Sequence, residues 1–313
     1  MLSRRLALGV LTAPVLAPRA FARARHVYDL EPVSIADGVW MIEGSTDYFS
    51  SENGGAIVNI ALLRGESGMI LVDSGPSLRY GEALLAVVKR LDSRGVSAVL
   101  NTHHHPDHFF GNQVFTDTPI LALGATRNAA LEEGDAFSDN MYRILGDWMR
   151  GTEVVPPTEV LQGGDVTVDG RDFVAMPLAG HTLSDLAVLD KATGLLIGGD
   201  LVFHNRAPTT PSADIAKWRE SLDELETVDA AAVLPGHGPL DRQGVAIQQT
   251  RDYLDWLDKA LRDAVHDGFD MVEVMGTTLP PEFAALGAQP EEFQRSVSHL
   301  FPDIEIEELP RGN

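Results

Sequence analysis

Four histidines and one aspartate fall within the six positions from His103 to His108, in the run Asn-Thr-His-His-His-Pro-Asp-His-Phe-Phe-Gly-Asn. Histidine is neither a good core residue nor a good turn former, so folding alone does not demand this density. Imidazole nitrogens and carboxylates are ligands that zinc, iron and manganese accept. A histidine-rich surface loop with adventitious metal binding is the alternative. The stretch predicts a metal centre if other segments of the chain supply further ligands.

An aliphatic run, Val96–Leu100, leads directly into this stretch. It predicts a buried strand that delivers ligands at its C-terminal end, where open α/β sheets usually place their sites. His103 and His105 are two residues apart, so on an extended backbone they point the same way and can hold one metal ion. His104 lies between them and should point away.

Pro106 follows, and proline interrupts a strand and turns the chain. Asp107 and His108 come directly after this turn. We therefore expect these two side chains to face a second metal ion beside the first.

The overall composition is that of an acidic globular protein, with 313 residues, a formal charge of -22, 44% hydrophobic residues and no cysteine. The acidity argues against nucleic acid and anionic membrane surfaces as partners. It also argues mildly against a strongly anionic substrate, unless a local basic pocket overrides it. The absence of cysteine excludes disulfides, thiolate ligands and a cysteine nucleophile.

Residues 1–24 are expected to be an export signal. A basic start at Arg4 and Arg5 precedes an apolar segment, Leu6–Ala17, which is too short to span a bilayer, and a small-residue cleavage site near Ala24. The start is similar to a twin-arginine signal, although the usual aromatic residue is absent. An uncleaved membrane anchor is the alternative. We expect a periplasmic protein without a membrane span in its mature form.

From Val33 onward the chain alternates between strand-like and helical segments. The predicted strands are Val39–Ile42, Ala56–Leu63, Met69–Val72, Val96–Leu100, Ile120–Leu123, Val166–Val168, Phe173–Met176, Leu186–Leu189, Leu195–Ile197 and Ala232–Leu234. The predicted helices are Ser77–Arg94, Ala125–Arg150, Asp214–Val228 and Val245–His266. Two halves of strands, each followed by a helix, predict an α/β fold of the four-layer αββα sandwich type. Residues 25–313 should form one domain, with a helical extension from about residue 243.

Asp73 directly follows the predicted strand Met69–Val72. A carboxylate at this place is either a helix N-cap or a site residue. Because Ser77 can cap the next helix by itself, Asp73 is free to orient a metal ligand through a hydrogen bond.

Candidates for a substrate pocket lie near the predicted ligands. Aromatic residues are expected to line its entrance, namely Tyr48, Phe49, Phe109 and Phe110. His204 and Arg206 are expected to face the substrate, with ordinary loop surface as the alternative. The long helical region also carries a stripe of large residues: Phe137, Met141, Tyr142 and Trp148. Core packing is the favoured role for this stripe, with one or two members reaching over the site.

Three more candidate ligands sit at predicted strand ends, each beside a glycine that lets backbone approach a crowded centre: His181, Asp200 and His237. Each of them alone is a weak signal, because an isolated Gly-His is usually a turn. In this order after His-x-His-x-Asp-His, the three form a strong one.

With these residues the chain resembles the metallo-β-lactamase superfamily from about Val33 to Val265. The resemblance implies the αββα fold and a site with two metal ions. The first ion would be held by His103, His105 and His181, and the second by Asp107, His108 and His237, with Asp200 bridging both.

More narrowly, three segments resemble the exported SoxH-type branch: Glu52–Gly55, Asp147–Glu153 and Leu201–Pro208. That branch includes the quinoprotein relay system zinc metallohydrolases, so the resemblance implies a functional link to a periplasmic quinoprotein dehydrogenase. An aspartate at position 200, without any cysteine, matches the glyoxalase-II-like and general-hydrolase arrangement rather than the cysteine-bearing β-lactamases. The acidic C-terminal end argues against glutathione, which glyoxalase II binds through basic residues.

The activity implied is hydrolysis of a small molecule at an ester, thioester, lactone or amide-type bond. Two zinc ions, with iron or manganese as alternatives, would share a water and lower its pKa to about 7, which yields a bridging hydroxide. Asp107 and Asp200 would be the catalytic carboxylates, with Asp107 also passing a proton to the leaving group. A mononuclear iron sulfur (persulfide) dioxygenase and a non-catalytic metal-binding accessory protein are the alternatives. The complete seven-residue set favours hydrolysis.

Overall fold

The structure is a computed structural model that describes residues 26–308. The expected export signal, residues 1–24, lies outside the described residues. The strands are β1 (Pro32–Ala36), β2 (Val39–Ile42), β3 (Ile60–Arg64), β4 (Met69–Val72), β5 (Val96–Leu100), β6 (Ile120–Ala122), β7 (Glu159–Val160), β8 (Gly164–Val168), β9 (Arg171–Leu178), β10 (Asp185–Asp190), β11 (Leu195–Phe203) and β12 (Ala232–His237). The helices are α1 (Leu78–Leu91), α2 (Pro106–Phe109), α3 (Gly124–Leu145), α4 (Ile215–Glu226), α5 (Ala246–His266), α6 (Met271–Met275), α7 (Pro281–Ala284) and α8 (Glu291–Glu308), with 3-10 turns η1 (Phe110–Phe115) and η2 (Gly146–Met149).

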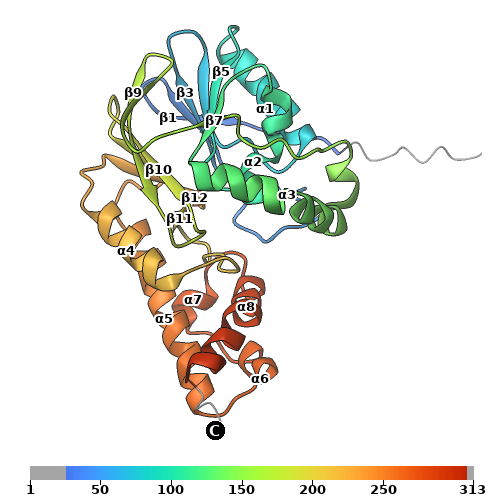
Figure 1. The fold of residues 1–313 in the computed structure, drawn as a ribbon, viewed down its shortest axis with the longest axis vertical. Coiled ribbons are helices and arrows are strands. Elements are labelled where there is room, and N and C mark those ends of the chain that lie inside the picture. Colours follow the sequence, from blue (N-terminus) through green and yellow to red (C-terminus); the bar gives the residue numbers. More distant parts are fainter. Residues whose placement is uncertain (1–25, 309–313) are drawn as a thin grey trace, which may run out of the picture.

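Two mixed sheets form the centre of the fold. The first sheet has the order β1-β2-β3-β4-β5-β6-β7, and the second has the order β12-β11-β10-β9-β8. In the first sheet, neighbours from β1 to β4 are antiparallel and those from β4 to β7 are parallel. In the second sheet only β11 and β12 run parallel. Figure 1 shows α1 and α3 on one side of the paired sheets and α4 and α5 on the other.

The layers follow from strands that are apolar on both faces. In β3, Ala61 and Leu63 pack between the two sheets, whereas Ile60 and Leu62 pack on the outer face with residues of α1 such as Leu84. This alternation is the period-two pattern of a strand covered on both sides. A third cluster joins the outer face of the second sheet to α4 and α5. The predicted αββα sandwich is therefore confirmed.

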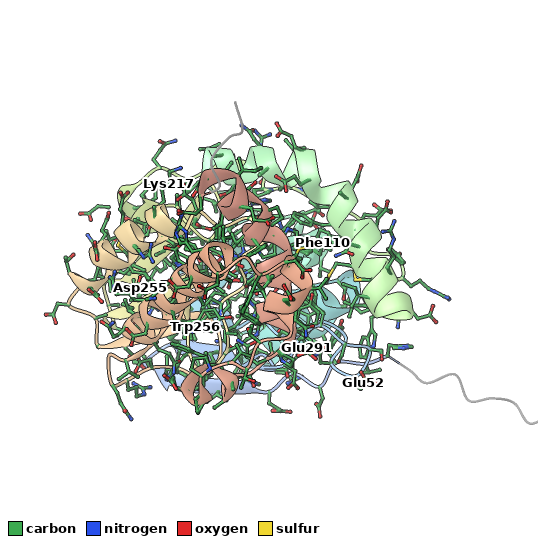
Figure 2. All side chains as sticks on the ribbon, turned by 90° about the horizontal axis from the view of Figure 1, so that it is seen from below. Glu52, Phe110, Lys217, Asp255, Trp256 and Glu291 are labelled. Atoms are coloured by element: carbon green, nitrogen blue, oxygen red, sulfur yellow. The ribbon has the colours of Figure 1, made fainter. Side chains whose placement is uncertain are left out.

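The helices α5 to α8, called the C-terminal lobe below, lie together at one end of the molecule (Figure 1), the end seen from below in Figure 2. They share a hydrophobic core of their own. Tyr253 and Leu257 from α5 meet Phe293 and Val297 from α8 in that core. The isolated bridge between Arg206 and Gly287 joins the lobe to the loop after β11. Among the described residues, the structure contains no helix with both the length and the apolarity required to cross a bilayer.

Seven of the ten predicted strands have different bounds in the structure, and two of these differences bear on the site. The strand expected at Ala56–Leu63 begins only at Ile60. The residue before it, Asn59, is bound to the segment at the end of β12 instead. Its amide Nδ2 donates to the carbonyl oxygens of Pro235 at 2.9 Å and Gly238 at 2.6 Å. The strand expected to end at Ile197 continues to Phe203 as β11, through register shifts on both sides of Gly199. Such bulges re-aim side chains near functional sites.

Candidate metal centre

All seven predicted ligands converge at one end of the two sheets. The loop after β5 and the short α2 carry four of them, the loop after β9 carries His181, and β11 and β12 carry Asp200 and His237. Their ligand atoms form two neighbouring groups, each within 4.8 Å: His103, His105, His181 and Asp200 in one, and Asp107, His108 and His237 in the other. Every member is buried. His104, expected to point away, belongs to neither group; its Nε2 lies 3.5 Å from a Glu133 oxygen.

Asp200 lies between the two groups. Its Oδ2 is 3.3 Å from His181 Nε2 and 3.2 Å from His237 Nε2. Its Oδ1 is 3.2 Å from His108 Nε2. One carboxylate therefore contacts histidines of both groups, and its Oδ2 alone lies close to one histidine of each.

Hydrogen bonds on the far side of the rings fix how the histidines are turned. Nδ1 of His181 donates to the carbonyl oxygen of Thr209 at 3.0 Å, and Nδ1 of His237 donates to that of Ile57 at 2.8 Å. Each of these bonds consumes the Nδ1 proton, so Nε2 presents a lone pair to the cluster. Fixing the ring in this way is how proteins prepare histidine for a metal.

Asp73 orients two further histidine rings, one directly and one through Thr102. Its Oδ2 accepts a hydrogen bond from His108 Nδ1 at 2.7 Å and another from the Thr102 hydroxyl at 2.8 Å. Because that hydroxyl gives its proton to Asp73, its oxygen is free to accept from His103 Nδ1 at 3.0 Å. Asp73 thus orients one histidine of each group, as expected for a residue that acts through the ligands.

The donor set fits divalent metal ions. His103 Nε2, His108 Nε2 and Asp200 Oδ1 are buried and make no hydrogen bond within the described part of the chain. His181 Nε2 faces His105 Nδ1 at 2.8 Å, so two ring nitrogens meet at close range. Buried polar atoms without partners are rare in native proteins and indicate a place for an ion or a water molecule. Five imidazoles and two carboxylates without thiolate suit zinc, iron or manganese.

The protonation of the cluster follows from its burial and its charges. Burial lowers the pKa of His103 and of His105 well below the usual range, and it lowers that of His181 to about 3. These three histidines are neutral at pH 7, as metal ligands must be. Burial also lowers the pKa of His108, but the carboxylates of Asp200, Asp107 and Asp73 outweigh it and raise that pKa well above the usual range. The same carboxylates favour a dication in this space.

Two glycines explain how the strands approach so closely. A Cβ atom on Gly236 would lie 1.9 Å from Asp200 Oδ1. A Cβ atom on Gly180, which has a φ of +135°, would lie 2.2 Å from the backbone of Trp218. Both positions require glycine, because any side chain would displace the segment that carries a candidate ligand.

A pocket of about 60 Å³ opens onto the cluster, and we call it the site pocket. Its lining includes His105, Asp107, Asp200 and His237. The remaining walls come from the loop before β3, from α3, from the loop after β11 and from α8: Tyr48, Phe49, Ile57, Pro106, Phe137, Asn140, Met141, Ile144, Thr209 and Arg295. Tyr48 and Phe49 line the pocket as predicted, and Phe137 and Met141 are the members of the helical stripe that reach it.

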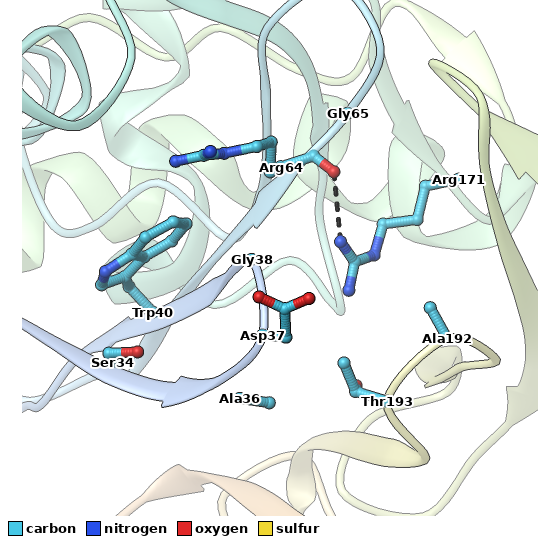
Figure 3. Close-up of a pocket in the computed structure, with 10 residues that line it drawn as sticks. All are labelled: Ser34, Ala36, Asp37, Gly38, Trp40, Arg64, Gly65, Arg171, Ala192 and Thr193. Atoms are coloured by element: carbon cyan, nitrogen blue, oxygen red, sulfur yellow. Dashed lines mark hydrogen bonds between the residues drawn. The ribbon is translucent and has the colours of Figure 1, made fainter.

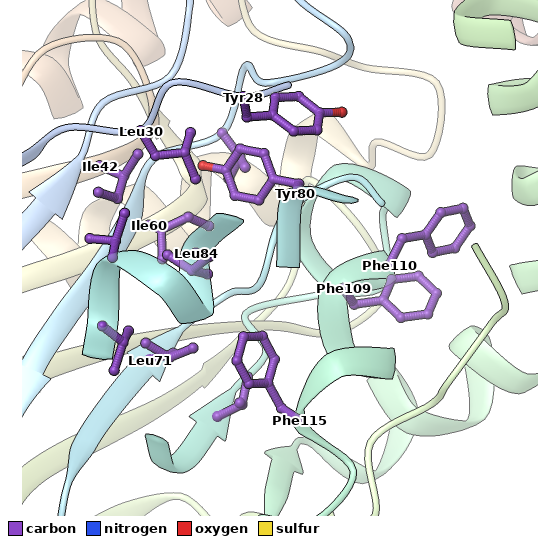
Figure 4. Packing of buried hydrophobic residues seen from close by; sticks show 14 of the residues in the cluster. Tyr28, Leu30, Ile42, Ile60, Leu71, Tyr80, Leu84, Phe109, Phe110 and Phe115 are labelled. Atoms are coloured by element: carbon purple, nitrogen blue, oxygen red, sulfur yellow. The ribbon is translucent and has the colours of Figure 1, made fainter. Parts of the chain in front are cut away.

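Four residues predicted for the pocket lie elsewhere. Phe109 is fully buried in the hydrophobic cluster on the outer face of the first sheet, together with Phe110 (Figure 4). His204 binds the carbonyl oxygen of Pro239 through Nδ1 at 2.8 Å. Arg206 is 1% exposed and pairs with Glu292 at 3.0 Å. The expectations for these four residues were wrong, because the two phenylalanines pack in the core and His204 and Arg206 each bind a structural partner.

A wider hollow of about 720 Å³ lies at the opposite strand ends and contains no predicted ligand (Figure 3). Arg171 donates there to the carbonyl oxygen of Arg64 at 3.1 Å and pairs with Asp190 at 2.7 Å. The guanidinium of Arg64 lies 5.1 Å from the ring of Trp40. The hydrogen bond from Arg171 to Arg64 ties the two sheets together at the end remote from the cluster.

Sequence reasoning missed several residues that support the site. Arg295 and Thr209 have no motif that would mark them, and they reach the pocket only because α8 packs back onto the loop after β11. Asp185 anchors the His181 loop by accepting from the Thr182 amide at 2.9 Å and from its hydroxyl at 2.8 Å. Burial raises the pKa of Asp185 to about 7. Its position four residues after His181, at the start of β10, was the one available signal.

Comparison with known proteins gives four findings. The model of the metallo-beta-lactamase superfamily matches residues 53–237. A linear primary-alkylsulfatase of Pseudomonas sp. is 22% identical over 78% of this chain and 54% of that protein, so the chain spans about half the length of this relative. The acyl-coenzyme A thioesterase MBLAC2 of Bos taurus is 29% identical over 65% of this chain and 79% of that protein. A solved metallo-beta-lactamase from Pontibacter korlensis has a similar fold, with a TM-score of 0.60, 22% identity, and coverage of 72% of this chain and 99% of the other.

Proposed function

This chain belongs to the metallo-beta-lactamase superfamily, and we propose that it is a metal-dependent hydrolase with two zinc ions. The observation that carries the proposal is the position of Asp200 between two groups of buried ligand atoms. A buried carboxylate that meets histidines on both sides suits the bridging position of a two-metal site. The relatives named as an alkylsulfatase and a thioesterase support hydrolysis as the reaction class.

The residues proposed to hold the metals are those of the two groups. His103, His105 and His181 would hold one ion, Asp107, His108 and His237 the other, and Asp200 both. When bound, zinc supplies a Lewis acid and a hydroxide nucleophile at neutral pH. Iron and manganese suit the same nitrogen and oxygen ligands, so the choice of zinc belongs to the proposal.

The side chains of the protein supply orientation and proton transfer. Asp73, Thr209 and Ile57 hold three histidine rings in fixed tautomers through their oxygen atoms. Asp107 lines the site pocket, and its Oδ2 lies 3.4 Å from His237 Nε2. This carboxylate takes up a proton from the attacking water and passes it to the leaving group. The apolar wall limits the access of bulk water to that exchange.

The substrate class we propose is a small molecule with an ester, thioester, lactone or amide-type bond. The resemblance to the SoxH-type branch supports two further proposals, a periplasmic location and a functional link to a quinoprotein dehydrogenase. Intact mass of the protein from a periplasmic fraction tests the location, with a mature chain that begins near residue 25 expected. A full-length chain retained in the cytoplasm would refute it.

The test of the hydrolase itself combines metal analysis with turnover. We expect two zinc ions per chain, and hydrolysis of at least one member of a panel of nitrophenyl esters, thioesters and lactams by the zinc-loaded protein. One tightly held iron with oxygen-dependent activity would instead support the sulfur dioxygenase. Full metal loading without turnover of any class of substrate would support the accessory protein.

A further inference from the structure

Arg295 lines the site pocket although it lies far along the chain from every candidate metal ligand. Its side chain is 29% exposed, and its contact to a carboxylate is a long one, 3.8 Å to Glu292 Oε2. Its guanidinium makes no hydrogen bond to any group in residues 26–308. A guanidinium has five N–H donors in a fork that matches carboxylate, sulfate and phosphate oxygens. Arg295 therefore brings unused donors to the pocket.

The charge of Arg295 is not cancelled by its neighbour Glu292. That carboxylate already pairs with Arg206 at 3.0 Å, and its Oε1 also accepts from the Thr209 hydroxyl at 2.7 Å. Both Arg206 and Glu292 are 1% exposed, so their charges neutralise each other within the protein. Two guanidinium groups thus share one carboxylate, and a net positive charge remains at Arg295.

The same contacts hold Arg295 in a fixed position relative to the metal cluster. The Thr210 hydroxyl donates to Ser296 Oγ at 2.7 Å, and Glu292 binds Thr209, so α8 is tied to the loop after β11 on both sides of Arg295. The carbonyl of Thr209 accepts from His181. The candidate ligand and the guanidinium are therefore positioned by one loop.

The other walls of the pocket offer no second cation. Among its lining residues within the described chain, Arg295 is the sole arginine or lysine. The pocket wall also contains largely apolar side chains, including Tyr48, Phe137 and Met141. The carboxylates in the pocket lining, Asp107 and Asp200, are proposed metal ligands. This arrangement offers an apolar channel with one positive group beside the reactive centre.

We propose that Arg295 binds an anionic group on the substrate, so that the enzyme prefers esters or thioesters that carry one carboxylate or sulfonate-like group besides the bond to be cleaved. This inference rests on the proposed hydrolase function. The acidic surface of the chain as a whole disfavours polyanions. The single guanidinium of Arg295, in a partly buried site, accommodates a monoanion. Arg295 therefore determines which substrate is bound and takes no part in the bond cleavage.

Steady-state kinetics on a matched pair of esters tests the preference. The pair is 4-nitrophenyl butyrate, which is neutral, and the mono-4-nitrophenyl ester of glutaric acid, which carries a carboxylate. We expect Arg295→Gln to lower kcat/KM for the anionic ester by about 10- to 100-fold, the loss of one charge-assisted hydrogen bond, mainly through KM. The neutral ester should change by no more than about twofold, and Arg295→Lys should retain part of the preference.

Arg219→Gln is the matched control, because it also removes the charge of an arginine. Arg219 lies on α4 and forms surface ion pairs with Asp255 and Asp258 of α5. The control variant should leave the ratio of the two esters unchanged. Two results together would overturn the inference while the hydrolase proposal stands. The wild-type enzyme would hydrolyse both esters equally well, and Arg295→Gln would lower kcat/KM for neither ester or for both by the same factor.

A binding measurement keeps the inference testable if neither ester is hydrolysed. Calorimetric titration compares butanesulfonate, a poor metal ligand, with uncharged butanamide on zinc-loaded protein. We expect Arg295→Gln to weaken sulfonate binding by about tenfold or more and to leave the amide unaffected. Equal sulfonate affinity in wild type and variant, or no sulfonate binding by the wild type, would refute the role of Arg295.

Discussion

Asp73 and His108 are joined by a hydrogen bond of 2.7 Å from His108 Nδ1 to Asp73 Oδ2. Through Thr102 the same carboxylate also orients His103. Asp73 has a φ of 65°, a left-handed conformation that aspartate and asparagine tolerate better than most residues. Its geometry thus permits a clean replacement by asparagine.

We predict that Asp73→Asn lowers zinc affinity and turnover by about 10- to 100-fold, because the two histidines lose the charged acceptor that fixes their rings. Metal content by mass spectrometry and kcat measure the two effects. Asp172→Asn, at an exposed residue that bonds Thr167, is the control and should change neither. Equal behaviour of both variants would contradict the orienting role of Asp73.

Asp200→Asn should lower turnover by on the order of 100-fold or more, because the neutral amide no longer balances two dications. Folding should survive, since the sheet pairing does not use this carboxylate, and circular dichroism can show it. His104→Ala is the control within the same histidine run, as His104 belongs to neither ligand group. If both substitutions reduce activity equally, the assignment of the ligands is wrong.

Gly236→Ala should reduce metal binding although it changes no ligand. The new Cβ would meet Asp200 Oδ1 at 1.9 Å, so the carboxylate or the strand has to move. We expect the loss of at least one metal ion per chain and a destabilisation of about 1–3 kcal/mol by denaturant unfolding. Gly276→Ala is the control, because its Cβ would lie 3.5 Å from the nearest atom. A fully metallated Gly236→Ala protein would show that the crowding is relieved at no cost to the site.

Acid should destabilise the metal-free protein. Burial lowers the pKa of His103 and His105 well below the usual range and that of His181 from 6.5 to about 3. Between these values the unfolded chain binds more protons than the folded one, so stability falls as the pH falls from 6.5 towards 3. His108, whose pKa is raised, opposes the other three. We expect a lower Tm for chelator-treated protein at about pH 5 than at about pH 7.5; an equal or higher Tm at pH 5 would contradict neutral histidines.

Arg206→Ala should destabilise the fold by about 3–5 kcal/mol, because it leaves Glu292 buried without its partner. Denaturant unfolding measures the loss. The double variant Arg206→Leu with Glu292→Leu removes both charges and should recover most of the stability. Stability unchanged in Arg206→Ala would indicate that the pair is not buried in solution.

The convergence of the seven candidate ligands was predictable from their spacing in the sequence and from their places at strand ends. The spacing of two placed His103 and His105 in one group, although the backbone bends at residues 102–104. Pro106 starts the short helix α2, which carries Asp107 and His108. Glycine beside His181, Asp200 and His237 marked the close approach of their strands. The layers were predictable for a related reason, since β3 and β4 are apolar at every position that two covered faces require.

The pocket was not predictable in the same way. Aromatic character does not separate a wall from a core, so Phe109 was expected at the entrance although it packs against Phe110. Arg206 was expected to face the substrate, but its charge is used by Glu292, which is 86 residues away in the sequence. The cation that does line the pocket, Arg295, depends on the docking of α8, and no local pattern encodes that docking.

All seven candidate ligands precede Gly238, whereas Arg295 belongs to a helix that starts at Glu291. On the proposed function, the residues that bind metal and the arginine that binds the anionic group of the substrate therefore come from separate stretches of the chain. A substitution at the inner surface of α8 can change which molecules are accepted without altering an atom that would bind metal. For engineering, this makes α8 the place to vary selectivity at constant chemistry, provided that the contacts of Glu292 and Ser296 to the loop after β11 are kept.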